Sequence, residues 1–226
     1  MAMAQGFVLS AWALLLWAAF ESRLVMVLPG FPIELPPSTV PGVVWLIAAR
    51  RFRVAAGNAP DLNGAAQLFF IAALLHAYLI PYLGWWHTVH VPWFKGFNRF
   101  LLAISIGAGF VSLFQLASDC ARRLDDKMLL AEIRIGAAAV PSLALLFAAL
   151  IRWSAIRAGA PESGLIDWFE TLRQAPHAPR LSAALVIVAP LSPAVLVLFE
   201  LERRIRLHLA GHEHEKNDSP LPNQAG

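Results

Sequence analysis

The sequence predicts an all-α protein, a polytopic bundle of transmembrane helices, and three observations lead to this fold class. First, 58% of the 226 residues are hydrophobic and 15% are charged, whereas soluble domains average about 45 to 50% and about 25%. Second, several apolar runs approach the roughly 20 residues that a helix needs to cross a bilayer. Third, the basic residues gather between these runs. Together these features predict that lipid surrounds the chain.

Composition and motifs exclude several other classes of protein. Cys120 is the only cysteine, so the chain has no disulfide framework and no paired-thiol or zinc motif. A net charge of +3, without a concentrated basic face, does not suggest a nucleic-acid partner. The sequence also lacks the Walker, dinucleotide-binding and G-x-S-x-G motifs. It therefore carries no soluble-enzyme signature and no signature of a nucleotide-driven pump.

The first apolar run covers about residues 7–28 and is predicted to be a retained span, since the N-terminus lacks the basic region of a signal peptide. Glu21 and Arg23 interrupt the run. At a spacing of two residues they do not face each other on a helix, so they lie either at the membrane interface or against other helices of the bundle. If Glu21 is buried, it is the best carboxylate in the chain for handling a proton or a cation.

The next segment, 29–53, is the hardest to assign. Five prolines interrupt its first part, and only residues 40–49 form an apolar run. A helix from about residue 41 to residue 53 would be only about 20 Å long. We predict a short sixth span, and the alternative is a re-entrant segment shielded by protein or lining a wet cavity.

Four further apolar runs, at about 62–86, 100–118, 135–153 and 181–199, can each cross roughly 30 Å of hydrocarbon. With the first run they make five firm spans. The run 100–118 also carries small residues at four-residue spacing, which lets helices approach closely. The pairs are Ala103 with Gly107, Ser105 with Gly109 and Ala108 with Ser112.

Two segments are predicted to lie outside the hydrocarbon. In the loop 165–172, apolar residues recur at positions i, i+3, i+4 and i+7, which is typical of an amphipathic helix lying in the interface. The segment 211–226 is short and polar and is predicted to be a disordered cytoplasmic tail. The chain is therefore predicted to be one transmembrane helical domain, 1–210, followed by the tail 211–226.

The basic residues fall unequally on the two predicted sides of the membrane. Eleven of the 18 lie on one side, in clusters that end the segment 29–53, separate the third and fourth firm spans, and follow the last span. Six lie on the other side. Because basic residues favour the cytoplasmic side, the sequence predicts a multi-pass inner-membrane protein with a cytoplasmic C-terminus. The N-terminus is then cytoplasmic with six spans and external with five.

His76 lies near the middle of the predicted span 62–86, where an ionisable side chain is costly and is a functional candidate for that reason. It could be a packing or hydrogen-bonding residue, a ligand of haem iron or chlorophyll magnesium, or part of a substrate or proton path. The other firm spans contain no histidine, which argues against haem held by two histidines. The sequence does not identify a cofactor.

His87 and His90 follow the same span and are three residues apart, so on a helix they would share a face and could ligate one metal ion. They also stand among Trp85, Trp86 and Trp93, as in the aromatic belt at the headgroup level. Both interpretations, a metal site and interfacial histidines, are open.

Sparse charge inside the spans leads to the principal functional hypothesis, a non-catalytic subunit or scaffold of a membrane protein complex. Its partners would be the lipid bilayer and other membrane subunits. One alternative is a small-solute or proton transporter whose path is lined by the segment 29–49 with Glu21, Arg23 and His76. Another is a haem-binding or pigment-binding redox subunit with His76 as the ligand.

Overall fold

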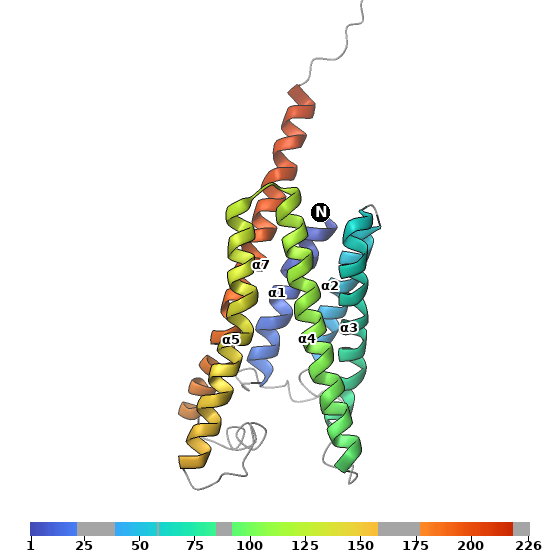
Figure 1. Ribbon diagram of the computed structural model, residues 1–226. Helices are drawn as coiled ribbons and strands as arrows, with labels where there is room; N and C mark the ends of the chain where they lie inside the picture. Colours follow the sequence, from blue (N-terminus) through green and yellow to red (C-terminus); the bar gives the residue numbers. More distant parts are fainter. Residues whose placement is uncertain (22–38, 58, 85–91, 158–176, 219–226) are drawn as a thin grey trace, which may run out of the picture.

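The computed structural model describes residues 1–21, 39–57, 59–84, 92–157 and 177–218, and these residues form helices and the turns between them, with no strand (Figure 1). The all-α prediction is therefore confirmed for the described part of the chain. The helices are α1 (Ala2–Glu21), α2 (Thr39–Ala56), α3 (Pro60–Gly84), α4 (Pro92–Arg123), α5 (Lys127–Arg157) and α7 (His177–Asp218).

Three of the described helices are long and apolar enough to cross a membrane. These candidate spans are Ala2–Ala19 in α1, Pro60–Leu79 in α3 and Gly96–Arg123 in α4. The prediction of five firm spans is thus confirmed only in part, because the runs 135–153 and 181–199 are helical in α5 and α7 but are not among the candidates.

Three other predicted elements have different outcomes. The short helix expected at about 41–53 is present as α2, which begins two residues earlier and ends three residues later. The amphipathic interfacial helix predicted at 165–172 lies outside the described residues. The tail is predicted to begin at residue 211, whereas α7 continues through Gly211 to Asp218. Gly211 does not end the helix, since one glycine costs a helix only about 1 kcal/mol, and the division into a domain and a disordered tail stays a prediction.

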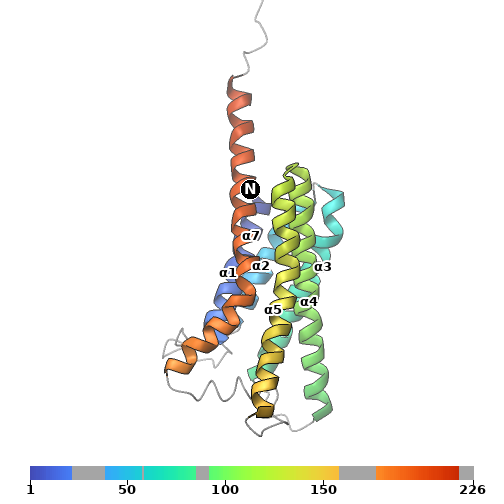
Figure 2. The ribbon, with the colours of Figure 1, turned by 60° about the vertical axis from the view of Figure 1, so that its left-hand side comes forward.

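The described helices alternate in direction, and each one packs against its neighbours along the chain (Figures 1 and 2). The last helix, α7, also packs against α1, so the order of contacts closes into a ring. The N-terminus, the α2–α3 turn, the α4–α5 turn and the C-terminal half of α7 lie at one end of the bundle (Figure 1). We call this the basic end.

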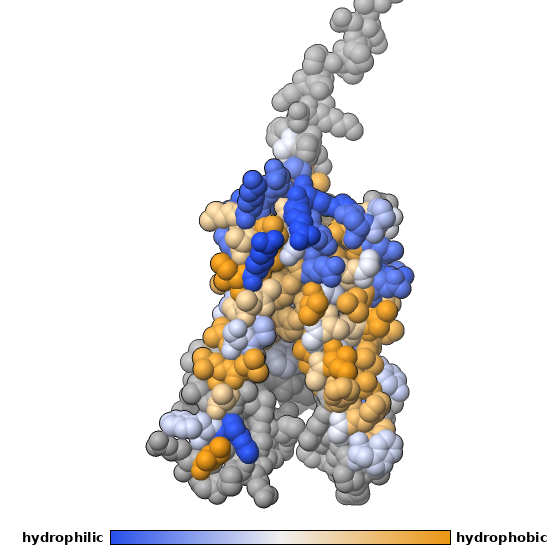
Figure 3. All heavy atoms as spheres, viewed as in Figure 1, coloured by the Kyte–Doolittle hydropathy of each residue, from blue (hydrophilic) through white to orange (hydrophobic). Residues whose placement is uncertain are grey.

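Hydrophilic side chains gather at the basic end, and apolar side chains predominate among the coloured residues directly below it (Figure 3). The three basic clusters of the sequence meet there, near the end of α2, around the α4–α5 turn and in the second half of α7. Two predicted spans separate each cluster from the next and would return the chain to the same side of the membrane. The common position of the three clusters in the fold agrees with this prediction.

The α4–α5 turn, residues 124–126, contains two aspartates whose conformations follow from local rules. Asp125 adopts a left-handed conformation (φ 50°), which aspartate tolerates better than most residues. The amides of Asp125 and Asp126 donate to the carbonyls of Arg122 and Ala121, as in a Schellman cap. Asp126 then caps α5, because its Oδ1 accepts a 2.9 Å hydrogen bond from the Leu129 amide.

Aromatic rings from three helices form the centre of the described core. Phe52 of α2 is fully buried, with ring centroids 4.8 Å from Phe7 of α1 and 5.4 Å from Phe69 of α3. Two turns earlier on α2, Trp45 lies 5.5 Å from the same Phe69. These edge-to-face contacts are the arrangement that aromatic pairs prefer, and they fix α2 against its two neighbours.

Candidate functional site

His76 is the one histidine, and the one acidic or basic residue, among the buried polar side chains of the described chain. It lies on α3, is 5% exposed, and packs edge to face on Trp45 with 5.3 Å between ring centroids. His76 Nδ1 and Trp45 Nε1 are both buried without a hydrogen-bond partner among the described residues. Two polar nitrogens thus lie unpaired within one aromatic contact, at a position where an unpaired polar group is expensive.

The position of His76 follows from the buried face of α3. Buried residues recur on this helix at intervals of three or four, which is the period of one helix face. The stripe comprises Leu62, Ala65, Ala66, Phe69, Ala72, Ala73, His76 and Leu79. His76 lies on the same face as Phe69, two turns earlier.

Trp45 of α2 contacts aromatic rings of both α3 and α4. Its ring lies 5.5 Å from Phe69 on α3 and 6.3 Å from Phe110 on α4. A methyl group placed on Gly109 of α4 would lie 2.9 Å from Trp45 Cη2, so only glycine leaves room for the indole at this point. His76 therefore belongs to a packed aromatic cluster formed by α2, α3 and α4.

The other buried polar side chains do not converge on His76. Ser10, Ser105 and Ser112 each donate a hydrogen bond to a carbonyl three or four residues earlier in the same helix, at 2.9, 2.8 and 2.6 Å. Such bonds satisfy a hydroxyl inside its own helix. These serines accordingly contribute no free donor to a path through the bundle.

The remaining predicted site residues are only partly described. Glu21 ends α1, and its side chain lies outside the described residues together with Arg23, His87 and His90. The metal and substrate-path hypotheses for them stay predictions. Within the described residues, no group of three or more histidine, cysteine, aspartate or glutamate side chains is placed to hold a metal ion.

Replacing His76 with leucine is expected to change the free energy of unfolding by no more than about 1 kcal/mol. The variant removes a buried unpaired nitrogen, worth about 1 to 3 kcal/mol, but also loses an aromatic contact worth about 0.5 to 1.5 kcal/mol. Unfolding in mixed micelles, followed by helical circular dichroism, measures the difference. A loss of more than about 2 kcal/mol would show that the nitrogen has a partner.

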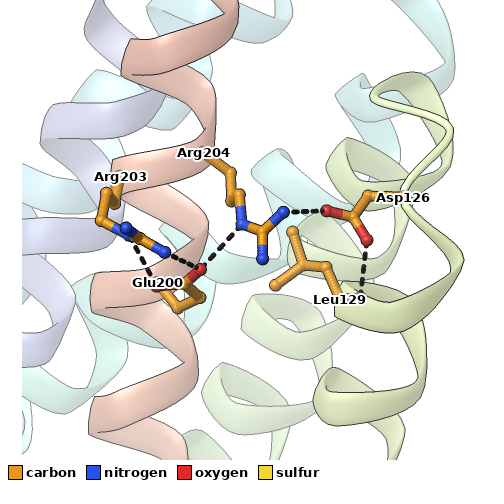
Figure 4. Close-up of polar contacts among 5 residues, drawn as sticks. All are labelled: Asp126, Leu129, Glu200, Arg203 and Arg204. Carbon is orange, nitrogen blue, oxygen red and sulfur yellow. Dashed lines mark hydrogen bonds and ion pairs between the residues drawn. The ribbon is translucent and has the colours of Figure 1, made fainter.

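A second polar site lies at the basic end and joins α7 to the start of α5 (Figure 4). Arg204 donates from Nη1 to Asp126 Oδ2 at 3.0 Å and from Nε to Glu200 Oε1 at 2.7 Å. Arg203 binds the same Glu200 carboxylate through two hydrogen bonds of 2.8 and 2.7 Å. Glu200 thus accepts from two guanidinium groups, and Arg204 bridges two carboxylates.

The sequence did not predict this bridge between Asp126, Arg204 and Glu200. Asp126 and Arg204 are 78 positions apart, and the mixed charges around the α4–α5 turn predict only a solvated helix end. The one local signal is the spacing of Asp126 from the first apolar residues of α5, which is typical of a helix cap. Nothing local pairs it with α7.

Hydrogen bonds from Arg203 and Arg204 lower the pKa of Glu200 from 4.5 to about 2. Because the pKa is lower in the folded state, the ion pairs stabilise the fold fully above pH 4.5, and this stabilisation is lost as pH falls toward 2. The carboxylate is partly solvated, so the effect is at most about 1 kcal/mol. We expect Glu200→Gln to flatten the decrease in thermal stability over this pH window.

Glu132→Gln serves as the control for this pH dependence. Glu132 is a half-buried residue of α5 that makes no ion pair in the described part of the chain. Its removal should leave the acid decrease in the melting temperature unchanged. If both variants flatten the curve equally, the decrease does not come from the Glu200 ion pairs.

Comparison with known proteins identifies no relative of the chain. No protein-family model, no curated protein and no solved structure matches it.

Proposed function

We propose that the chain is a non-catalytic subunit or scaffold of a membrane protein complex. The observation that carries the proposal is the contrast between the inside and the outside of α4. Inside, Gly109 receives the Trp45 ring. Outside, a methyl group added to Gly107 would have no neighbouring atom within 4 Å, and Ala103, one turn earlier, is also exposed. Small residues at this spacing let another transmembrane helix approach closely.

The described interior supports the same function. Its serine hydroxyls bond within their own helices, and His76 packs among aromatic rings with no buried acidic or basic side chain beside it in the part of the chain described. Such an interior stabilises a bundle, whereas a transport path or a redox site requires several polar groups that converge. The transporter and cofactor-binding hypotheses remain as alternative proposals.

The proposed location is the inner membrane, with the C-terminus in the cytoplasm. Five firm spans and the short span α2 would give six crossings. An even number agrees with the position of the N-terminus and the second half of α7 at the same, basic end (Figure 1). By the positive-inside rule that end faces the cytoplasm. A reporter fused after Gly226 that is active in the periplasm would contradict this orientation.

Purification in a mild detergent, followed by mass spectrometry of the chains that copurify, tests the subunit function. We expect a defined set of membrane partners, which Gly107→Leu reduces by filling the close-approach surface. Gly64→Leu is the matched control, because Gly64 of α3 is exposed and also has open space around it.

Two results would contradict the subunit function. A monodisperse single chain with no partner, even after chemical cross-linking in the membrane, would remove its basis. A visible absorption band that disappears in His76→Leu would instead support the haem-binding or pigment-binding alternative.

A further inference from the structure

We propose that the C-terminal part of α2 binds an anionic phospholipid, with Arg50, Arg51 and Arg53 at the headgroup. All three arginines are exposed, and none has a carboxylate partner among the described residues. This site rests on the membrane location proposed above and not on the role as a subunit.

The other arginine clusters at the basic end differ in one respect, since their charges are neutralised by nearby carboxylates. The ion pairs are Arg122 with Asp119, Arg123 with Asp61, Arg203 with Glu200, Arg204 with Asp126 and Arg206 with Glu202. On α5, Lys127 and Arg134 have no such partner in the described residues, but they stand seven positions apart. The end of α2 is therefore the densest uncompensated positive charge among the described residues at this end.

The α2 helix itself offsets only a small part of this charge. A helix C-terminus carries about half an elementary negative charge, whereas the three guanidinium groups carry three positive charges. One of them is held in place, because the Arg53 guanidinium lies 4.6 Å from the ring centroid of Phe70 on α3. A cation over a ring keeps the N–H groups at its edge available for an anion.

The surface below the arginines selects a lipid over a free anion. Val43 and Ile47 of α2 are 48% and 45% exposed. With Arg50 they stand at positions i, i+4 and i+7, so they form one stripe along the helix. An acyl chain can lie along Val43 and Ile47 while the phosphate of the same molecule contacts Arg50 and Arg53, one turn apart. Guanidinium groups bind phosphate through paired hydrogen bonds.

Native mass spectrometry of the delipidated full chain, titrated with phosphatidylglycerol or phosphatidylcholine of identical acyl chains, tests the site. We expect phosphatidylglycerol to be retained preferentially. The triple variant Arg50→Gln/Arg51→Gln/Arg53→Gln should weaken this binding by about tenfold or more. The control, Arg122→Gln/Arg203→Gln/Arg206→Gln, removes the same formal charge from paired arginines and should retain the lipid.

Several outcomes would overturn the site. One is equal binding of the two lipids. Another is an equal loss of phosphatidylglycerol binding in both triple variants, which would indicate bulk electrostatic attraction. A third is displacement of the lipid by inorganic phosphate at millimolar concentration. If the triple variant does not fold, Arg50→Gln/Arg53→Gln is measured instead, and unchanged binding in that variant overturns the site as well. Failure of the chain to enter bilayers of either lipid would contradict the membrane location itself.

Discussion

Phe52→Ala is expected to lower the free energy of unfolding by about 3 to 5 kcal/mol. Phe52 is fully buried and contacts Phe7 and Phe69 edge to face, at 4.8 and 5.4 Å between centroids. Its removal leaves a cavity between α1, α2 and α3 that rigid neighbouring rings cannot fill. Detergent-induced unfolding followed by circular dichroism measures the loss, which should be among the largest for any single truncation in the described chain.

Two comparisons isolate the cause of this loss. Phe100→Ala truncates a ring that is 62% exposed on α4 and should cost less than about 0.5 kcal/mol. Gly6→Ala places a methyl group 2.5 Å from Phe52 Cε1, so it should be destabilising alone and harmless in the Phe52→Ala background. Equal costs for Phe52→Ala and Phe100→Ala, or additive costs at positions 6 and 52, would contradict this packing.

The apolar runs predicted the positions of the helices more accurately than the residues at which the helices end. The run 100–118 lies inside α4, which extends from Pro92 to Arg123. Hydropathy marks only the part of a helix that suits hydrocarbon, whereas helix ends depend on caps such as the one formed at Asp125 and Asp126. The extra turns of α4 could not be predicted from its apolar run for this reason.

The sequence predicted His76 as a candidate residue but did not predict which side chains surround it. His76 stands out in the sequence because it is a histidine within a span. The sequence does not mark the buried face of α3, because apolar residues such as Leu68, Ile71 and Leu74 lie on its exposed face as well. Its contact with Trp45 depends on how α2 is rotated about its own axis, which no local pattern of α2 determines. The Asp126–Arg204 bridge is equally non-local, since it joins residues of α7 and the α4–α5 turn.

The small residues of α4 illustrate the same limit. Ala103 with Gly107 and Ser105 with Gly109 have identical spacing, so the sequence marks both pairs as close-approach positions. Only the tertiary structure distinguishes them, because Ser105 is buried and Gly109 lies against Trp45, whereas Ala103 and Gly107 are exposed.

This difference gives the second large effect, which we expect for Gly109→Ala. The new methyl group would lie 2.9 and 3.0 Å from two carbons of the Trp45 ring. The ring cannot move away easily, because Phe69 and His76 contact it as well. Overpacking of this kind costs about 1 to 3 kcal/mol, and the displaced indole should change the intrinsic fluorescence.

Gly107→Ala, two residues away on the same helix, is the matched control. It meets no atom within 4 Å and should be neutral or stabilising by up to about 1 kcal/mol, since alanine favours the helix more than glycine. The two substitutions add the same methyl group to the same helix, so their difference in unfolding free energy reports the Trp45 contact alone. Equal effects would mean that α2 does not pack against α4 at Trp45, and the environment assigned to His76 would then be wrong too.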